Sequence, residues 1–451
     1  MSDLSGVSVL VAGAGLAGLA AARDLSAHGA SITVIDARDR VGGRVFTARS
    51  GFVNGQHAEA GADMIDEAHS ETRQLAAELG LPLTRILRSG WGYARPDAKG
   101  RTRMVGRRGR RGTHGWDRLA GVLADLIARY RLVERRWDSP ITAAMARTSV
   151  AQWLDAVRAD EELRSTACGL RGFFLADADD LSLLALVDQF AEFTESDGGE
   201  WLTYRIEGGN DRLADALARP LGHRLHLNTE LVAISHRGRG VRASVKNSLQ
   251  VSTIDCDYLV SALPAPLLRR IPITPALSAP QHDAIARLKY GRATKTLLQF
   301  SRPFWRLKGR ARAFGSPLSW GAVWDGNEEQ RGRAGILSLM AGGSASDATD
   351  TTLQRNGPSA LARELDWLGS SRADLLGHHH TSWGADPWAR GGYAHFDPAF
   401  DPSLRVWLAR PSGRLFFAGE HTSFDGQGYM NGAIQSGRRA AAEVAAVHAS
   451  E

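Results

Sequence analysis

The sequence predicts an α/β fold that contains a Rossmann-like dinucleotide-binding domain, and three observations support this prediction. The chain has 451 residues, of which 43% are hydrophobic and 23% charged, as is typical of a globular protein with two or three domains. A short apolar run near the start is followed by closely spaced glycines and then by an alanine-rich stretch of helical character. A second apolar run ends in an aspartate, which completes the pattern of a first dinucleotide-binding βαβ unit.

The first strand is predicted over residues 7–12, and the helix after the turn is expected to end at Gly29. Gly13 allows the tight turn, Gly15 lets the backbone approach a pyrophosphate, and Gly18 lets the helix pack closely on the strand. The N-terminus of the helix then faces the anion. The cofactor contacts expected from this turn are at Gly13, Gly15, Leu16, Ala17 and Gly18.

The second strand is predicted over residues 31–35 and is followed directly by Asp36. A carboxylate at this place accepts hydrogen bonds from ribose hydroxyls and disfavours a 2′-phosphate. The next segment, ARDRVGGR over residues 37–44, sets arginines around a glycine pair and brings cations and close backbone beside the pyrophosphate. This continuation favours FAD over NAD, and the contacts expected from it are at Ala37, Arg38, Gly42, Gly43 and Arg44.

Together with the glycine turn, this segment resembles the ADP-binding start of the flavin-containing amine oxidase superfamily, which includes monoamine oxidases, polyamine oxidases and L-amino-acid oxidases. The resemblance extends along most of the chain. Residues 204–210, followed by a helical stretch to Ala218, look like the family's return into the FAD-binding domain. Residues 231–234 and 241–245 are predicted to be paired strands, and residues 257–262 a further strand.

The resemblance also implies cofactor contacts in two segments whose residue patterns do not by themselves indicate cofactor binding. It places the backbone of Val232 beside the adenine, although a valine in a strand is ordinarily a core residue. It places the flavin-side loop at residues 59–65, which the sequence matches only loosely, with backbone contacts at Ala62 and Met64.

The C-terminal segment carries the most specific part of the resemblance. Residues 415–420 are predicted to be an apolar strand ending in Gly-Glu, and residues 428–434 open a final helix that is expected to reach about Val447. The N-terminus of this helix would direct free amides at the flavin and stabilise the negative charge of its reduced form. The resemblance implies that Glu420 contacts the ribityl chain and that the Met430 backbone contacts the flavin ring. The cofactor contacts expected here are at Gly419, Glu420, Gly428, Tyr429, Met430 and Ala433.

Four side chains are expected to act in catalysis: Lys295, Trp383, Tyr393 and Tyr429. Lys295 lies in a predicted strand, where a lysine is usually an edge residue whose ammonium reaches solvent. The resemblance instead implies that Lys295 holds a water near flavin N5 and assists reoxidation by oxygen. Trp383, which also counts as a flavin contact, and the two tyrosines match the aromatic residues around the flavin of monoamine oxidases. Two facing tyrosine rings would guide an amine edgewise to the flavin, whereas core packing is the ordinary role of a single aromatic ring.

FAD is expected to be bound noncovalently. Animal monoamine oxidases attach their flavin through a cysteine directly before the first cage tyrosine, and this chain has Gly392 at that place. The two cysteines of the chain, Cys168 and Cys256, lie elsewhere in the sequence.

The fold class predicted for the whole chain is α/β with two domains. A Rossmann-like FAD/NAD(P)-binding domain is expected to be interleaved with a substrate-binding domain of mixed sheet and helices. The FAD-binding segments are expected at residues 1–79, 205–287 and 384–451, and the substrate-binding segments at residues 80–204 and 288–383.

The predicted function is an FAD-dependent amine oxidase. A hydride moves from the α-carbon of the amine to flavin N5, giving an imine, and O2 is reduced to H2O2. Two alternatives remain open. An L-amino-acid oxidase needs an arginine for the α-carboxylate, and the sequence cannot nominate one among its fifty arginines. A biosynthetic tailoring oxidase would act on a larger amine or amide metabolite. A flavin-binding protein without turnover is a third, non-enzymatic hypothesis.

The remaining sequence features argue against nucleic acid, a membrane or a metal ion as a partner. The net charge is +6 and residues 101–111 carry six arginines, but without interleaved aromatics this run favours a solvated loop over a nucleic-acid site. No long apolar run or basic leader is present, and the two cysteines are far apart, so we expect a cytoplasmic protein without a membrane span. Three adjacent histidines, residues 378–380, would point to alternate faces of a strand, so no metal site is expected. The expected partners are a small amine and O2, and a homodimer remains open.

Overall fold

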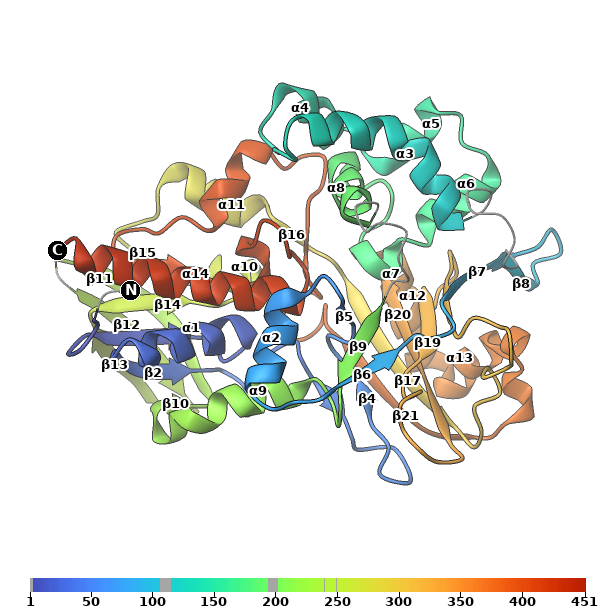
Figure 1. Ribbon diagram of the computed structural model, residues 1–451, viewed down its shortest axis with the longest axis horizontal. Coiled ribbons are helices and arrows are strands. Elements are labelled where there is room, and N and C mark those ends of the chain that lie inside the picture. Colours follow the sequence, from blue (N-terminus) through green and yellow to red (C-terminus); the bar gives the residue numbers. More distant parts are fainter. Residues whose placement is uncertain (1–2, 106–114, 194–201, 239, 249) are drawn as a thin grey trace.

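The structure is a computed structural model that describes residues 3–105, 115–193, 202–238, 240–248 and 250–451. Two bodies built on β-sheets lie side by side, and a group of helices lies above them in the view of Figure 1. Most of the predicted basic run at residues 101–111 falls outside the described residues.

The first body contains a five-stranded sheet in which all neighbouring strands run parallel. Its strands, in order across the sheet, are β10 (Leu225–His226), β2 (Ser31–Ile35), β1 (Ser8–Ala12), β14 (Tyr258–Ser261) and β23 (Leu415–Phe417). The helices α1 (Leu16–Ala27) and α14 (Met430–Ala449) pack against each other along one face, and α9 (Asp211–Ala218) lies beside α1. The predicted opening βαβ unit, the strand after residue 257, the strand at residue 415 and the final helix are therefore confirmed.

The side chains of β1 alternate between two hydrophobic cores. Val9 and Val11 pack with residues of α1 and α14, whereas Leu10 and Ala12 belong to a core shared with Ala243 of the layer on the other face. Because both faces of the strand are buried, its sequence is a continuous apolar run without polar alternation.

The layer on the other face is a four-stranded sheet. Its order is β13 (Gln250–Cys256), β12 (Gly240–Asn247), β11 (Thr229–Arg237) and β15 (Ile273–Thr274). β11 and β12 run antiparallel with Leu231 opposite Val245, which confirms the predicted strand pair. The register shifts between Leu231 and Ala233, so Val232 occupies a β-bulge, where the backbone ladder is interrupted.

The second body is a seven-stranded mixed sheet. Its order is β21 (Leu375–Ser382), β17 (Ala293–Phe300), β20 (Gly335–Gly342), β19 (Ala322–Asp325), β18 (Ala313–Gly315), β7 (Trp91–Pro96) and β8 (Thr102–Val105), and only β18 and β7 pair parallel. The helices α12 (Ser344–Asn356) and α13 (Pro358–Glu364) belong to this body.

β17, the predicted strand that carries Lys295, is buried at every position. Leu298 packs in a core with Leu361 of α13, and Leu297 packs on the other face with Ala48. Lys295 is therefore not an edge residue that reaches solvent, and it is only 2% exposed.

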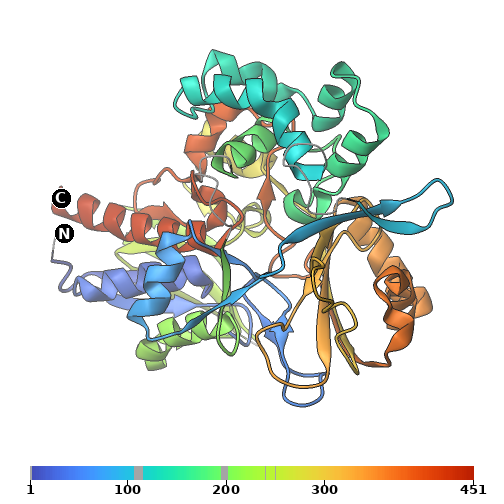
Figure 2. The same ribbon diagram turned by 45° about the vertical axis from the view of Figure 1, so that its right-hand side comes forward.

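The helical group lies above the junction of the two sheet bodies (Figures 1 and 2). It contains α3 (Gly115–Leu132), α4 (Pro140–Arg147), α5 (Val150–Ala156), α6 (Glu161–Cys168), α7 (Arg171–Phe174) and α8 (Leu183–Phe193). α3 packs on both α6 and α8, and α7 contacts β20 of the seven-stranded sheet. α5 begins at a capping box in which Ser149 and Gln152 bind each other's backbone amides.

Short elements join these parts. A three-stranded sheet has the order β5 (Ile65–Asp66), β9 (Thr203–Ile206) and β6 (Leu83–Ile86), and two strand pairs are β3 (Thr47–Ala48) with β4 (Ala58–Glu59) and β16 (Lys289–Tyr290) with β22 (Ala394–His395). The remaining helices are α2 (Ser70–Glu78), α10 (Ala265–Leu268) and α11 (Ala279–Arg287), with 3₁₀ turns η1 (Arg219–Arg224), η2 (Asp366–Leu368), η3 (Ser370–Arg372), η4 (Pro402–Leu408) and η5 (Glu420–Thr422). α9 is the helical stretch expected to end at Ala218, and β9 lies directly before it in the chain.

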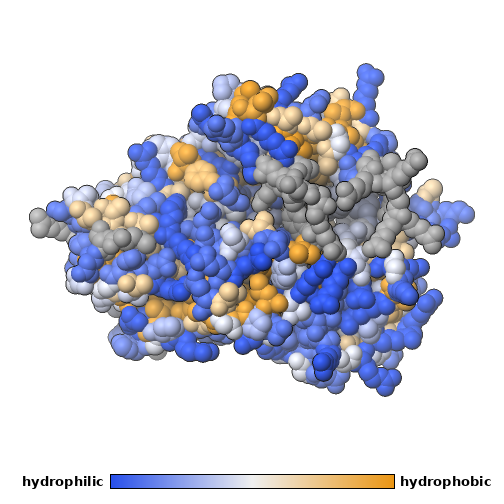
Figure 3. Space-filling model, viewed as in Figure 1, coloured by the Kyte–Doolittle hydropathy of each residue, from blue (hydrophilic) through white to orange (hydrophobic). Residues whose placement is uncertain are grey.

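Hydrophilic residues cover most of the face shown in Figure 3, where apolar residues are scattered. Among the described helices, none combines the length and the apolar character needed to cross a membrane.

Candidate active site

A cavity of about 1000 Å³ lies between the two sheet bodies and the helical group. Its walls include the end of β1, the start of α1, β17, α3 and α8. The predicted site residues that line it are Gly13, Gly15, Leu16, Ala17, Asp36, Ala37, Arg38, Gly42, Gly43, Arg44, Ala62, Met64, Val232, Lys295, Trp383, Tyr393, Gly419, Glu420, Gly428, Tyr429, Met430 and Ala433. Gly18 is the one predicted residue that does not line it.

The glycines of the turn after β1 have different roles: Gly18 allows close packing, and Gly15 faces the cavity. A Cβ added to Gly18 would lie 1.9 Å from the carbonyl oxygen of Gly13, so Gly18 serves the close packing of helix and strand. Gly13 has a φ of +109°, which favours glycine. A Cβ added to Gly15 would meet no atom within 4 Å, because this backbone faces the cavity. α1 begins at Leu16 without a side-chain cap, so its first amides are available to an anion.

Asp36 is held in place by backbone amides. Its Oδ2 accepts a hydrogen bond from the Ala14 N–H at 2.7 Å, and its Oδ1 accepts one from the Arg38 N–H at 2.8 Å. The guanidinium of Arg38 donates two hydrogen bonds to Asp386, at 2.6 and 3.0 Å. The positive charge expected from Arg38 is therefore paired with a carboxylate 348 positions away, which the sequence analysis did not identify.

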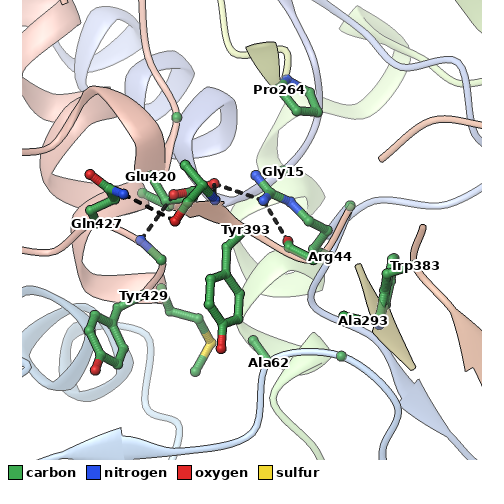
Figure 4. Close-up of a pocket in the computed structure, with 18 of the residues that line it drawn as sticks. Gly15, Arg44, Ala62, Pro264, Ala293, Trp383, Tyr393, Glu420, Gln427 and Tyr429 are labelled. Atoms are coloured by element: carbon green, nitrogen blue, oxygen red, sulfur yellow. Dashed lines mark hydrogen bonds and ion pairs between the residues drawn. The ribbon is translucent and has the colours of Figure 1, made fainter. Parts of the chain in front are cut away.

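Arg44, which is half-buried, and the buried Glu420 form an ion pair in the cavity wall (Figure 4). Nη1 of Arg44 donates to Oε1 of Glu420 at 2.8 Å and to the Gly392 carbonyl at 2.7 Å, and the Gly428 N–H donates to Oε2 of Glu420 at 2.9 Å. Burial by itself would raise the pKa of Glu420, but Arg44, His421 and the Gly428 N–H together outweigh burial and hold this pKa below its usual range. Glu420 is thus a carboxylate with a fixed orientation.

Lys295 projects from β17 into the cavity and is held by two acceptors. Its Nζ donates to Oδ2 of Asp63 at 2.8 Å and to the Gly61 carbonyl at 3.0 Å. The indole N–H of Trp324 donates to the same oxygen of Asp63 at 2.9 Å, and the ammonium lies 4.9 Å from the Trp324 ring centroid. Burial lowers the pKa of Lys295, although the Asp63 carboxylate opposes that effect.

Arg205 extends this buried charge network. Its Nε donates to Oδ1 of Asp63 at 2.9 Å, and its Nη1 donates to Glu329 at 2.8 Å. Burial by itself would raise the pKa of Asp63, but Arg205 and Lys295 together hold it below its usual range. Burial, together with the nearby Asp63 carboxylate, raises the pKa of Glu59 to about 8. Two carboxylates close together therefore have different charge states at neutral pH.

Tyr393 and Tyr429 both line the cavity, and their rings point toward the same side of it in Figure 4. The Tyr393 hydroxyl donates to the Phe173 carbonyl, and the Tyr429 hydroxyl donates to Oε1 of Gln189 at 3.2 Å. Each ring is thus anchored at its hydroxyl by the helical group, which leaves the ring faces to shape the cavity.

Two further aromatic residues lie beside these rings, since Tyr393 packs against the buried cluster that contains Trp383 and Tyr429 packs against His69. Trp383 is 5% exposed, and its indole N–H donates to the Ala60 carbonyl at 3.0 Å, so the indole plane is fixed. His69 packs against Tyr429 with ring centroids 4.8 Å apart. Trp383 was predicted from the sequence, whereas His69 was not.

The cavity wall contains many aromatic residues to which the sequence assigned no individual role. Six of its aromatic residues are Trp91, Trp116, Phe173, Phe190, Trp324 and Phe396. They come from separate elements and share no spacing in the sequence. The sequence assigned no role to Asp63 or Arg205 either, although Asp63 is the one acid among residues 60–65, which are otherwise apolar, and this was a usable signal.

The end of the cavity near α1 fits FAD by its chemistry. The open backbone at Gly15 and the uncapped start of α1 suit a pyrophosphate, and the fixed Asp36 carboxylate suits ribose hydroxyls. The helix α14 begins at Met430 with no side-chain cap, so a second set of free amides faces the cavity. Among the described residues, no group of three or more His, Cys, Asp or Glu side chains is arranged to hold a metal ion.

Comparison with known proteins gives a consistent result. The model of the flavin-containing amine oxidoreductase family matches residues 16–445. AofH of Mycobacterium tuberculosis, which carries the name of a flavin-containing monoamine oxidase, is 30% identical over 461 residues, covering 98% of this chain and 97% of that protein. A putrescine oxidase of Kocuria rosea is 28% identical over 461 residues, covering 97% of this chain and 94% of that protein.

Solved structures show the same fold. Cyclohexylamine oxidase from Brevibacterium oxydans superposes with a TM-score of 0.85 at 26% identity, covering 98% of this chain and 99% of that one. A triple mutant of putrescine oxidase with redesigned cofactor binding superposes with a TM-score of 0.85 at 25% identity and the same coverage.

Proposed function

The chain belongs to the flavin-containing amine oxidoreductase family, and from this premise we propose that it is an FAD-dependent oxidase of a small amine. As a member it is a flavoprotein that acts on CH–NH bonds, with FAD as its cofactor. The proposal that the substrate is a small amine rests on one observation. The glycine turn, Asp36, Lys295 and the two tyrosines all line a single cavity.

We propose how the chain holds FAD. The amides at the start of α1 and the backbone at Gly15 bind the pyrophosphate, and Asp36 binds the adenosine ribose. The Val232 backbone, at its bulge, lies beside the adenine. Glu420 binds the ribityl chain, and the amides at Met430 stabilise the reduced ring.

FAD, when bound, supplies an acceptor for the hydride that leaves the amine α-carbon and a place where O2 is reduced to H2O2. The chain supplies the position and the environment of the substrate. The aromatic walls exclude water and favour the neutral form of the amine, because an unpaired ammonium is costly to bury. Tyr393 and Tyr429 orient the amine between their rings. For a primary amine the net reaction consumes O2 and water and gives a carbonyl compound, ammonia and H2O2.

One N–H group of the Lys295 ammonium has no acceptor in the described part of the chain and is available to a molecule in the cavity. Asp63 and the Gly61 carbonyl accept two of its three N–H groups, and no third acceptor lies within reach among the described residues. We propose that the remaining N–H holds a water beside the flavin and assists oxygen reduction. Asp63 keeps the ammonium in that orientation.

We further propose that FAD is bound without a covalent link. Gly392, which precedes Tyr393, offers no nucleophile, and neither cysteine is among the described residues that line the cavity. Denaturation with acid is expected to release all of the FAD into the supernatant.

An anaerobic absorbance titration of the purified holoenzyme tests the proposed function. Primary amines, secondary amines, polyamines and amino acids are added in turn, and the absorbance band of oxidised flavin is followed. Bleaching by one class, recovery on admission of air and formation of H2O2 are the expected results. A yellow protein that no nitrogen compound bleaches would overturn the proposal.

A further inference from the structure

Arg405 presents a buried positive charge in the wall of the cavity. It lies in η4, lines the cavity and is 6% exposed. No carboxylate of the described chain lies within ion-pair distance of its guanidinium. Buried arginines are almost always paired, because an isolated charge in a medium of low dielectric is costly. This arginine therefore lacks a partner that its position requires.

The contacts of Arg405 leave most of its donors unused. Nη2 donates to the Phe424 carbonyl at 2.7 Å, whereas Nε and Nη1 have no hydrogen-bond partner in the described part of the chain. The guanidinium lies 4.2 Å from the ring centroid of Trp137 and 5.3 Å from that of Phe396. These rings hold the guanidinium in place by its faces, where they cannot replace a hydrogen-bond acceptor.

The two acidic side chains whose charges act on Arg405, Asp188 and Asp425, do not supply that acceptor. Asp188 directs its Oδ1 to the Tyr130 hydroxyl at 2.7 Å and to Arg135 at 3.1 Å. Asp425 is exposed on the rim of the cavity. Both act on Arg405 only through longer-range electrostatics.

The position of Arg405 connects it to the substrate end of the cavity. Asp188, whose charge acts on Arg405, precedes Gln189, and Gln189 accepts the hydrogen bond of the Tyr429 hydroxyl. Phe396, which packs on Arg405, follows Tyr393 by three positions on a segment that lines the same cavity. Arg405 therefore lines the same cavity as the two tyrosines that would hold the amine.

We propose that Arg405 binds a carboxylate of the amine substrate, so that the enzyme oxidises an amino carboxylic acid. This inference rests on the proposed function and narrows its substrate class. A guanidinium with free N–H groups forms charge-assisted hydrogen bonds to a carboxylate, and exclusion of water strengthens them. The net charge of +6 would also attract an anionic substrate to the protein.

Binding to the oxidised holoenzyme tests the site without any turnover. We would titrate 3-phenylpropanoate, butanoate and the corresponding uncharged amides, and follow the visible spectrum of the bound FAD. At least one carboxylate is expected to bind more tightly than its amide, and Arg405→Met is expected to weaken that binding by about 10- to 150-fold, the loss typical of a hydrogen bond to a charged group. Arg242→Met is the matched control, because Arg242 is exposed, paired with Asp255 and outside the cavity.

Turnover of matched pairs then locates the carboxylate relative to the amine. L-phenylalanine is compared with 2-phenylethylamine, and 4-aminobutanoate with butylamine. The wild type is expected to prefer the carboxylate in one pair, and Arg405→Met to lower kcat/KM for that compound alone. Preference within the first pair indicates an α-carboxylate and preference within the second a distant one, and either result supports the proposal.

The outcomes separate this inference from the proposed function. If amines are oxidised but no carboxylate binds or is preferred, the inference is overturned and the proposed function stands. If no compound reduces the flavin but carboxylate binding is lost in Arg405→Met, the anion site stands and the proposed function falls. Equal losses for charged and uncharged members of a pair would assign Arg405 a packing role and overturn the inference. Thermal unfolding and FAD content of Arg405→Met and Arg405→Lys identify a folding defect, and recovery of carboxylate binding in Arg405→Lys supports the site.

Discussion

At the scale of single residues, the cavity depends on charges that are buried in pairs. Lys295 and Arg205 share Asp63, so one carboxylate fixes the position of two cations. Such an arrangement contributes little net stability compared with apolar packing, because the desolvation of the ions offsets their attraction. Its value here is that it holds an ammonium in a defined orientation inside an apolar cavity.

Replacement of Lys295 by Met tests its role in the reaction with oxygen. We expect reoxidation of the reduced enzyme by O2 to slow by about 100-fold, the low end of the range for a positioned proton donor. Reduction by the amine should change by less than about threefold, because the tyrosines remain. Stopped-flow mixing of the reduced enzyme with O2 measures the first rate. Lys289→Met, at an exposed lysine of β16, is the control, and wild-type reoxidation in Lys295→Met would contradict the assignment.

Glu59 predicts a pH dependence of stability. Its pKa is raised from 4.5 to about 8 in the folded protein, so the folded state binds more protons than the unfolded state between these values. Stability from this group is therefore complete below about pH 4.5 and is lost as the pH rises through 8.

Glu59→Gln should remove this effect. The variant is expected to match the wild type in thermal unfolding at pH 5 and to be more stable than it at pH 9, by up to a few kcal/mol at about 1.4 kcal/mol per pKa unit. Melting curves at several pH values measure the difference. A constant difference across that range would show that Glu59 does not titrate as described.

At the scale of elements, the start of α1 separates a packing glycine from a binding glycine. A Cβ at Gly18 would collide with the Gly13 carbonyl, whereas a Cβ at Gly15 would point into open space. The two residues belong to one turn and one motif, yet their substitution should have opposite consequences.

We expect Gly15→Val to fold but to lose FAD. The added side chain meets no protein atom near its Cβ, but it occupies the space that the pyrophosphate needs. Gly18→Ala should instead lower the stability of the protein itself, because its Cβ lies 1.9 Å from a carbonyl oxygen. Circular dichroism of the apoproteins and their FAD content measure both effects. Retention of FAD by Gly15→Val would place the pyrophosphate elsewhere.

At the scale of the whole molecule, the cavity has walls from both sheet bodies and from the helical group. We propose that the division into FAD-binding segments 1–79, 205–287 and 384–451 and substrate-binding segments 80–204 and 288–383 describes these bodies. Its support is that the five parallel strands fall within the first set and the seven strands of the mixed sheet within the second. FAD would then contact both domains.

Removal of FAD should therefore destabilise the whole molecule. A ligand present at 100 times its Kd stabilises the state that binds it by about 2.7 kcal/mol. We expect the apoprotein to unfold at a lower temperature than the holoenzyme and re-addition of FAD to restore the midpoint. Scanning calorimetry with and without FAD measures the shift. Equal midpoints would indicate that FAD binds both states alike or contributes no contacts between the bodies.

The sequence determined what depends on neighbours along the chain. The glycine turn, Asp36 and the start of α14 were recognisable because a tight turn, a strand end and a helix N-terminus each need particular residues at fixed spacing. The paired strands β11 and β12 were recognisable because each is a short local run of strand-forming residues. The predicted cofactor residues consequently gather around one cavity, apart from Gly18.

Only the tertiary structure decided which side chains meet. Lys295 and Asp63 are 232 positions apart, and Arg38 and Asp386 are 348 apart, so no local spacing relates them. The same holds for Arg405, one of fifty arginines, whose lack of a partner becomes visible only once Trp137 and Phe396 have closed around it. The physical reason is that burial and the pairing of charges are properties of the packed whole, whereas turns and helix ends are set by a few consecutive residues.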